Sequence, residues 1–154
     1  MIYKKIITYG TFDMFHIGHL NLIKKIKEIG SEVIIGVSTD EFNEEKGKKC
    51  IIPYEQRAEI VRCISGVDLV IAESDWDQKV SDIRKYSVDC FVMGSDWDGK
   101  FDYLQDLCEV VYLPRTDGIS TTEIKELLKG FSPTFKKDFN NMFNILDTLR
   151  QDLM

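Results

Sequence analysis

The chain has 154 residues, of which 44% are hydrophobic and 30% charged, a composition typical of a folded globular domain. Its formal net charge of −6 argues against nonspecific binding to a nucleic-acid backbone. The apolar runs span only a few residues and the four cysteines form no C-x-x-C pair, so we expect neither membrane insertion nor a disulfide framework. These features predict a reduced, cytoplasmic protein with a single core.

Apolar runs rich in β-branched residues alternate with segments of helical period, which is typical of β-α-β units in a parallel sheet. Continuous apolar strands indicate that helices cover both faces of that sheet. The expected strands are Ile6 to Tyr9, Glu32 to Val37, Leu69 to Ala72, Asp89 to Met93 and Glu109 to Leu113. The expected helices are Ile17 to Lys27, Tyr54 to Arg62 and a segment around Val80 and Ile83.

The chain closes with two further helical patterns. Residues Thr121 to Lys129 predict a helix with Ser120 as N-cap, Glu123 in the capping-box position and Gly130 as the stop. Apolar residues then recur at helical spacing from Phe135 to Leu153. This stripe predicts an amphipathic helix that packs on its own domain or at a subunit contact, because a long apolar face does not stay solvated.

Both histidines of the chain lie in one segment, Gly10 to His19, where the first expected strand gives way to the first expected helix. In open α/β sheets, ligands bind at this edge. His16 and His19 are three residues apart, so their rings can face the same side of an early helical turn. Two imidazoles beside helix N-terminal amides form a receptor for phosphate, and Gly18 between them admits a close approach.

Three other kinds of site lack support in the sequence. A zinc site needs three or four ligands, and no third histidine or paired cysteine is available. The segment Gly94 to Lys100 fits G-x-x-x-x-G-K, but Phe101 stands where a P-loop carries Ser or Thr, and two carboxylates in the loop would repel phosphate. The chain contains no G-x-G-x-x-G of a dinucleotide oxidoreductase and no G-x-S-x-G of a serine hydrolase.

The segment Gly10 to His19 resembles the H-x-G-H signature of the nucleotidyltransferase superfamily, and its opening Gly-Thr-Phe-Asp is similar to the cytidylyltransferase branch. A distant second motif, Arg115 to Thr122, is similar to the R-T-x-G-I-S-T-T motif of the glycerol-3-phosphate cytidylyltransferase family. The resemblance spans residues 3 to 129 and includes, in the family's order, Ser38 to Asn43, Tyr54 to Arg57, Val92 to Lys100 and Val110 to Pro114.

The resemblance implies a Rossmann-like α/β catalytic domain over residues 1–130, an open parallel sheet with helices on both faces, and a helical extension over residues 131–154. It implies transfer of CMP from CTP to a small phosphorylated alcohol, with glycerol 3-phosphate favoured. The acceptor phosphate would attack directly in line, with release of pyrophosphate. Mg²⁺ would be held mainly through the CTP phosphates, with no ligand set from the protein. The family also implies a homodimer.

The resemblance further assigns roles to residues of this chain. The expected catalytic residues are His16, His19, Lys46 and Arg115. The expected CTP site comprises Gly10, Thr11, Phe12, His16, Gly18, His19, Asp96, Arg115, Ser120, Thr121 and Thr122. Asp96 would lie near the base, where a carboxylate can accept a hydrogen bond from the cytosine amino group. The expected acceptor-binding residues are Asp13, Lys46 and Lys48.

One position departs from the family pattern. The family carries an arginine where this chain has Ser65 and an aromatic residue where it has Gly66, so the phospho-acceptor can differ from glycerol 3-phosphate. Arg62, one helical turn earlier, is the candidate substitute, whereas Arg57 is expected to pair with nearby carboxylates. The sequence is also compatible with a related adenylyltransferase, with a nucleotide-binding module that lacks catalysis, and with a partner-binding module built on the C-terminal helix.

Overall fold

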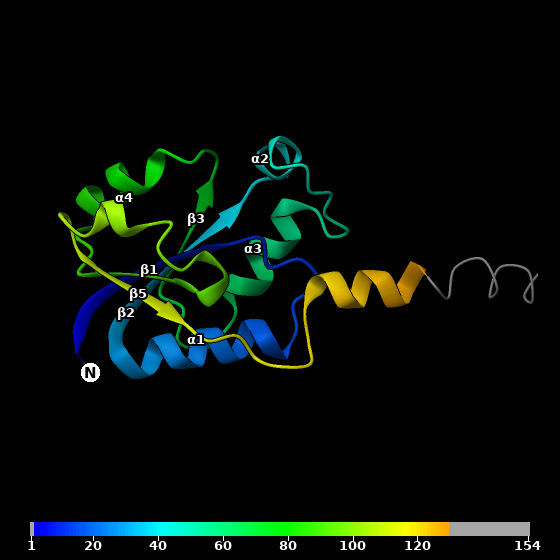
Figure 1. Cartoon of the computed structure of the whole chain (residues 1–154), viewed down its shortest axis with the longest axis horizontal. Helices are drawn as coiled ribbons and strands as arrows, with labels where there is room; N and C mark the ends of the chain where they lie inside the picture. The colour runs from blue at the N-terminus through cyan, green and yellow to red at the C-terminus, as the bar shows by residue number, and fades with distance from the viewer. Residues whose placement is uncertain (1, 130–154) are drawn as a thin grey trace, which may run out of the picture. The chain divides into compact units, whose positions relative to one another are not determined.

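The computed structural model describes residues 2–129, and the chain divides into two compact units after Gly118. The first unit is built on a parallel sheet of five strands in the order β3-β2-β1-β4-β5 (Figure 1). All five expected strands are confirmed, with small differences at their ends. The strands are β1 (Tyr3–Gly10), β2 (Gly30–Ser38), β3 (Leu69–Glu73), β4 (Cys90–Gly94) and β5 (Glu109–Leu113).

Four α-helices lie between these strands, and three of them confirm expected helices. They are α1 (Ile17–Ile29), α2 (Asp40–Glu45), α3 (Tyr54–Arg62) and α4 (Gln78–Tyr86), followed by the 3₁₀ turns η1 (Ser95–Trp97) and η2 (Asp102–Leu104). Helix α2 was not expected, because its six residues span fewer than two turns and show no apolar period. Its start is nevertheless marked by a cap, since the Thr39 side chain accepts a hydrogen bond from Phe42 N.

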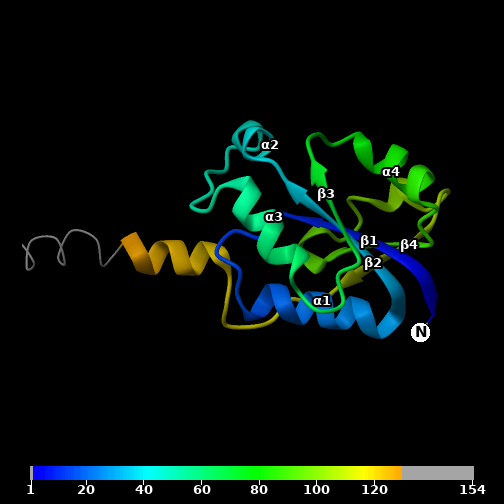
Figure 2. The same ribbon diagram turned by 180° about the vertical axis from the view of Figure 1, so that it is seen from behind.

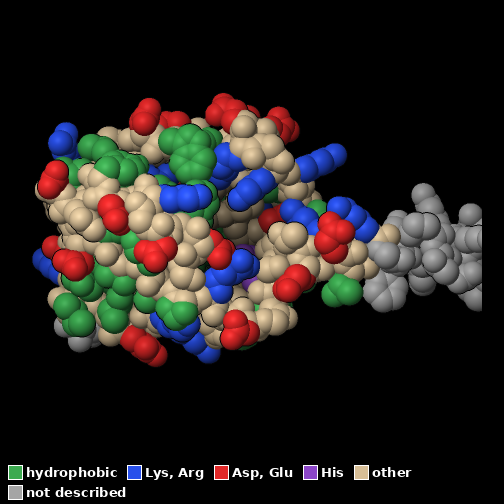
Figure 3. Space-filling model, viewed as in Figure 1, with side chains coloured by type: hydrophobic (Ala, Val, Ile, Leu, Met, Phe, Trp, Pro, Cys, Tyr) green, Lys and Arg blue, Asp and Glu red, His purple; other side chains and the backbone are tan. Residues whose placement is uncertain are grey.

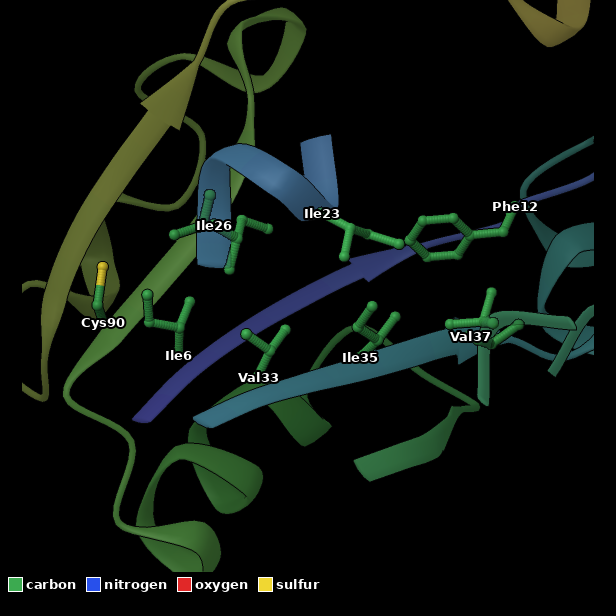
Figure 4. Close-up of a cluster of buried hydrophobic side chains, with 10 residues drawn as sticks. Ile6, Phe12, Ile23, Ile26, Val33, Ile35, Val37 and Cys90 are labelled. Atoms are coloured by element: carbon green, nitrogen blue, oxygen red, sulfur yellow. The ribbon is translucent and has the colours of Figure 1, made fainter. Parts of the chain in front are cut away.

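The sheet is buried on both faces, which explains why its strands read as continuous apolar runs. Neighbouring residues of a strand point to opposite faces, so Ile6 packs under α1 and α3 while Ile7 packs on the α4 side. Figure 4 shows the first of these clusters, in which Ile23 and Ile26 of α1 lie over the strands. Figures 1 and 2 show α1 and α4 on opposite sides of the sheet. The expected Rossmann-like class is confirmed.

The strand order places the ligand edge of the sheet. Strand β1 pairs with β2 on one side and with β4 on the other. Strands β2 and β3 are added on one side of β1, and β4 and β5 on the other, so the topological switch point lies between β1 and β4. In doubly wound sheets, the crevice outside the carboxyl ends of such strands receives the ligand. Here β1 leads into the histidine segment and β4 leads into the turn that carries Asp96.

The second unit begins at Ile119 and is described as far as residue 129. Residues 121–129 are helical, as expected, and Ser120 Oγ accepts a hydrogen bond from Glu123 N at 3.1 Å. The expected N-cap is therefore confirmed. The predicted stop at Gly130 and the predicted C-terminal helix over 131–154 lie outside the described residues. Within the described part of the chain, no helix combines the length and the apolarity that a membrane span requires.

Candidate active site

The two histidines form a reciprocal cap at the start of α1. His16 is the N-cap residue, and its Nδ1 accepts a hydrogen bond from Gly18 N at 3.0 Å. His19 Nδ1 in turn accepts from His16 N at 3.2 Å. The imidazole rings stack with their centroids 3.8 Å apart and an interplanar angle of 24°. The expectation that both rings face the same side is confirmed. The Gly18 amide takes part in the cap as a donor to His16.

This hydrogen-bond pattern assigns the tautomer of both rings. Because each Nδ1 accepts a backbone N–H, each neutral imidazole carries its proton on Nε2. Burial lowers the pKa of His16, and the nearby Arg115 charge lowers it further. Burial also lowers the pKa of His19 to about 4, with His16 adding to the effect and Asp13 opposing it. Both rings are therefore neutral at pH 7 and carry Nε2–H donors.

Aromatic side chains hold the ring of His19 in place. The rings of Phe12 and Phe15 both have centroids 5.3 Å from that of His19. Phe12 is 5% exposed, and a Cβ at Gly10 would come within 2.9 Å of the Phe12 ring. Glycine is needed at position 10 for this close approach. Phe12 was expected to contact the nucleotide, but the structure places its ring in the core beneath the histidine.

Asp13 connects the histidine segment to the lysine-containing loop that follows α2. It is 1% exposed, and its two carboxylate oxygens accept hydrogen bonds from Ile51 N at 2.8 Å and Ile52 N at 2.9 Å. Asp13 was expected to bind the acceptor. Because its carboxylate is buried against the backbone and would repel a phosphate, the structure places it as an anchor of this loop.

Arg57 of α3 completes the same scaffold. It is 1% exposed, and its guanidinium donates to the carbonyl oxygens of Ile52, Thr11 and Ser38 at 2.6 to 2.8 Å. It also pairs with Asp40 at 2.7 Å. Burial opposes ionisation of Asp40, but the Tyr54 amide and Arg57 together hold its pKa below the ordinary value. The expected pairing of Arg57 with a carboxylate is confirmed. The hydrogen bonds of its guanidinium connect the carboxyl ends of β1 and β2 to the loop that follows α2.

Lys46 is the C-cap residue of α2, and its side chain reaches the carboxyl end of β2. Its Nζ donates to Ser38 Oγ at 3.1 Å, lies 3.7 Å from Glu73 Oε1 and sits 4.2 Å from the centroid of the Phe42 ring. Its side chain is 12% exposed. Lys79 of α4 shares the same glutamate, at 2.7 Å from Oε2. Lys48, the other expected lysine, is exposed.

Arg115 and Asp96 meet at the carboxyl ends of β5 and β4. The Arg115 guanidinium donates to Asp96 Oδ2 at 2.7 Å, and both side chains are about half exposed. The same segment is tied to α1, since Asn21 Nδ2 donates to Thr116 Oγ1 at 3.2 Å. Figure 3 shows the histidine side chains at the surface beside lysine or arginine side chains. The first unit thus gathers two neutral imidazoles and two cations, Lys46 and Arg115, along the sheet's ligand edge.

Comparison with known proteins identifies the family of this chain. The family model described as "Cytidylyltransferase-like" matches residues 7–127. The chain belongs to this cytidylyltransferase-like family. It is 57% identical over 123 residues to the glycerol-3-phosphate cytidylyltransferase of Bacillus spizizenii, covering 80% of this chain and 95% of the relative. It is 55% identical over 127 residues to the Bacillus subtilis protein of the same description, covering 82% and 98%.

The fold agrees with solved structures of more distant proteins. A lipopolysaccharide core biosynthesis protein from Thermoplasma volcanium superposes with a TM-score of 0.64 at 21% identity, covering 75% of this chain and 99% of that one. A bifunctional NMN adenylyltransferase/ADP ribose pyrophosphatase from Francisella tularensis gives 0.62 at 18% identity, covering 81% and 42%. At these identities the likeness concerns the fold alone.

The remaining residues that the sequence singled out make other contacts or belong to other parts of the chain. Thr11 Oγ1 donates to Asn43 Oδ1 at 2.9 Å. Ser65, where the family was expected to carry arginine, lines a surface pocket of about 530 Å³ with Lys24 and Lys27. Arg62, the candidate substitute, is exposed and pairs with Glu59 on its own helix. Ser120, Thr121 and Thr122 open the helix of the second unit.

Sequence reasoning missed two charged residues at this edge, Glu73 and Lys79. Glu73 is 4% exposed and Lys79 1% exposed. A charged residue at the end of an apolar strand was the signal for Glu73, because the carboxyl ends of parallel strands form the ligand edge. Lys79 carried no such signal, since a lysine in a surface helix usually faces solvent.

Proposed function

We propose that this protein transfers CMP from CTP to glycerol 3-phosphate and releases pyrophosphate. The observation that carries the proposal is the stacked pair His16 and His19, whose Nε2–H donors follow the first strand of the sheet. The family match and relatives more than 50% identical over most of their length support the choice of nucleotide and acceptor. An oxygen of the acceptor phosphate attacks the α-phosphorus in line, so no covalent enzyme intermediate forms.

The histidine pair acts on the transferring group. As the α-phosphoryl group passes through its transition state, charge develops on its oxygens, and two fixed N–H donors stabilise that charge without reorganisation. Neutral rings suit this role, because each must keep Nδ1 unprotonated to accept its backbone hydrogen bond. The caps therefore hold both donors in a set orientation.

Lysine and arginine side chains bind the other phosphates of the reaction, those of the acceptor and of the departing pyrophosphate. We assign the acceptor phosphate to Lys46 and Lys48, and the departing pyrophosphate to Arg115 and Lys46. From the sequence motif, we also assign the pyrophosphate to Ser120, Thr121 and Thr122. A guanidinium presents a planar fork of donors that matches two phosphate oxygens. Asp96 is assigned to the cytosine amino group.

Mg²⁺ fits this site as part of the nucleotide and not as a resident ion of the protein. Among residues 2–129, no group of three or more His, Cys, Asp or Glu side chains is placed to hold a metal. Three carboxylates that follow the strand ends are engaged, Asp13 by backbone amides, Asp40 by Arg57 and Asp96 by Arg115. Mg²⁺ prefers oxygen ligands and keeps several waters, which the CTP phosphates allow. When bound, it neutralises phosphate charge.

The test measures pyrophosphate release and transfer of label from α-labelled CTP or ATP to glycerol 3-phosphate, phosphocholine or phosphoethanolamine. We expect a labelled CDP-alcohol only with CTP, with glycerol 3-phosphate preferred. Equal use of CTP and ATP would contradict the cytidylyl assignment, and preference for another acceptor would show that Ser65 marks a changed specificity. CTP binding without pyrophosphate release would indicate a non-catalytic module. The family resemblance also supports a cytoplasmic homodimer. A light-scattering measurement of the mass in solution tests the dimer.

A further inference from the structure

Glu73 is a buried carboxylate at the ligand edge of the sheet. It ends β3, lies opposite Ser38 in the β2–β3 register, and is 4% exposed. Its Oε1 accepts a hydrogen bond from the Ser38 hydroxyl at 2.5 Å and lies 3.7 Å from Lys46 Nζ. Its Oε2 accepts from Lys79 Nζ at 2.7 Å. One carboxylate thus faces two ammonium groups, one from the C-cap residue of α2 and one from α4.

The two lysines differ in their access to a ligand. Lys79 is 1% exposed, and its Nζ lies 4.6 Å from the ring centroid of Tyr9, 5.1 Å from that of Trp76 and 5.6 Å from that of Phe101. Its ammonium group is therefore enclosed by protein. The Lys46 side chain is 12% exposed, at the end of the loop whose far end Asp13 anchors.

We propose that Glu73 is a positioning residue for the binding of the acceptor phosphate. The Glu73 carboxylate holds the Lys46 ammonium group in place, and Lys79 is the fixed counterion of Glu73. The inference rests on the proposed function, because it takes Lys46 as a phosphate ligand. A buried carboxylate with two cationic partners and a hydroxyl donor is restrained on both oxygens, so it sets where the Lys46 ammonium lies.

A purely structural ion pair between Glu73 and Lys79 predicts something different. That pair would stabilise the fold, and its loss would leave Lys46 chemistry unchanged. If Glu73 positions Lys46, loss of the Glu73 charge changes the properties of Lys46 itself. Burial lowers the pKa of Lys46, Glu73 and Cys50 oppose this, and Lys48 and Lys79 add to it. Removing the Glu73 charge therefore lowers the pKa further and weakens the hold on the acceptor at alkaline pH.

The test compares Glu73→Gln with a matched control, Glu32→Gln. Glu32 is also a strand glutamate paired with a lysine, at 3.7 Å from Lys5, but it lies in the amino-terminal half of β2. For Glu73→Gln we expect KM for glycerol 3-phosphate to rise roughly tenfold, because a charge-assisted phosphate contact is weakened. KM for CTP should rise less, because Arg115 also holds the pyrophosphate end of the nucleotide. The alkaline limb of kcat/KM should move to lower pH. Glu32→Gln should keep the wild-type values.

A second variant guards against a folding failure of the first. Glu73→Gln leaves the buried Lys79 ammonium without its carboxylate, whereas Glu73→Gln combined with Lys79→Met removes both charges. The double variant should show the same rise in acceptor KM but a smaller shift of the alkaline limb, because loss of Lys79 removes a charge that lowers the pKa of Lys46. A folded variant of either kind with wild-type KM and pH profile would overturn the inference. Absence of transfer to glycerol 3-phosphate by the wild-type protein is a distinct result, because it contradicts the proposed function itself.

Discussion

The carboxylate of Asp96 accepts a hydrogen bond from the Arg115 guanidinium at 2.7 Å, so an ion pair links the residues that follow β4 and β5. In the proposed reaction these two side chains serve opposite ends of the nucleotide, the base and the departing phosphates. The pair holds both groups at the same edge of the sheet. It also directs one Asp96 oxygen toward Arg115, and the carboxylate stays about half exposed and open to a base.

Substitution of Asp96 by Ala should therefore erode the preference for CTP over ATP by roughly tenfold or more, because the acceptor for the cytosine amino group is lost. The ratio of kcat/KM for the two nucleotides measures this change. Asp106→Ala removes an exposed acidic residue from the same β4–β5 connection and is the control. An unchanged ratio in folded Asp96→Ala would remove Asp96 from base recognition.

The histidines should matter for turnover far more than for CTP binding. We expect His16→Ala and His19→Ala each to lower kcat by about 10²-fold or more, since a donor used in the transition state is removed. His16→Asn is the sharper variant, because asparagine is a strong N-cap that can accept from Gly18 N while lacking Nε2. It should retain thermal stability and lose turnover. Near wild-type kcat in this folded variant would exclude His16 from the chemistry.

Arg57 should be needed for stability as well as for the site. Lysine at this position keeps the charge but cannot reach the three carbonyl oxygens and the Asp40 carboxylate that the guanidinium contacts. We expect Arg57→Lys to lower the free energy of unfolding by about 3 kcal/mol, measured by urea denaturation. Arg62→Lys, at an exposed position of the same helix, should change it little. If Arg57→Lys lowers the free energy of unfolding by much less than the loss of a single buried hydrogen bond would, Arg57 does not hold these segments together.

The lowered pKa of His19 predicts a pH dependence of stability. An unfolded histidine takes up a proton near pH 6.5, whereas burial lowers the pKa of folded His19 to about 4. Between these values the unfolded chain binds more protons, so the free energy of unfolding should fall as pH falls from 6.5 toward 4 and be flat above 6.5. Urea denaturation of wild type and His19→Gln across this range isolates the effect. Identical slopes in the two proteins would show that His19 titrates normally.

Residues 132–154 should be dispensable for catalysis. The family model ends at residue 127, and the B. subtilis relative is matched over 98% of its length by 127 residues of this chain. Deleting residues 132–154 should therefore leave CTP specificity and kcat unchanged, while stability or light-scattering mass changes if the apolar stripe packs against protein. A truncated protein of unchanged mass and stability that lacks activity would contradict this expectation.

Much of the architecture followed from local patterns. All five strands and the helices α1, α3 and α4 were evident in the sequence, because apolar runs and helical periods record which faces are buried. The facing of His16 and His19 was also evident, since three residues of helix bring two side chains to one side. Family membership followed from the two motifs and is confirmed by the match over residues 7–127.

The tertiary structure alone decided the partners of the charged residues. Asp13 meets backbone amides of Ile51 and Ile52, and Glu73 meets Ser38 and Lys46, because the chain path brings distant segments together. The energies of these contacts depend on burial and on the separation of the charges. A local pattern carries neither quantity. The sequence by itself determined the five strands and three of the four helices between them, and it predicts where the phosphate chemistry lies. The packing of β3 beside β2 decided that Glu73 meets Ser38 and Lys46.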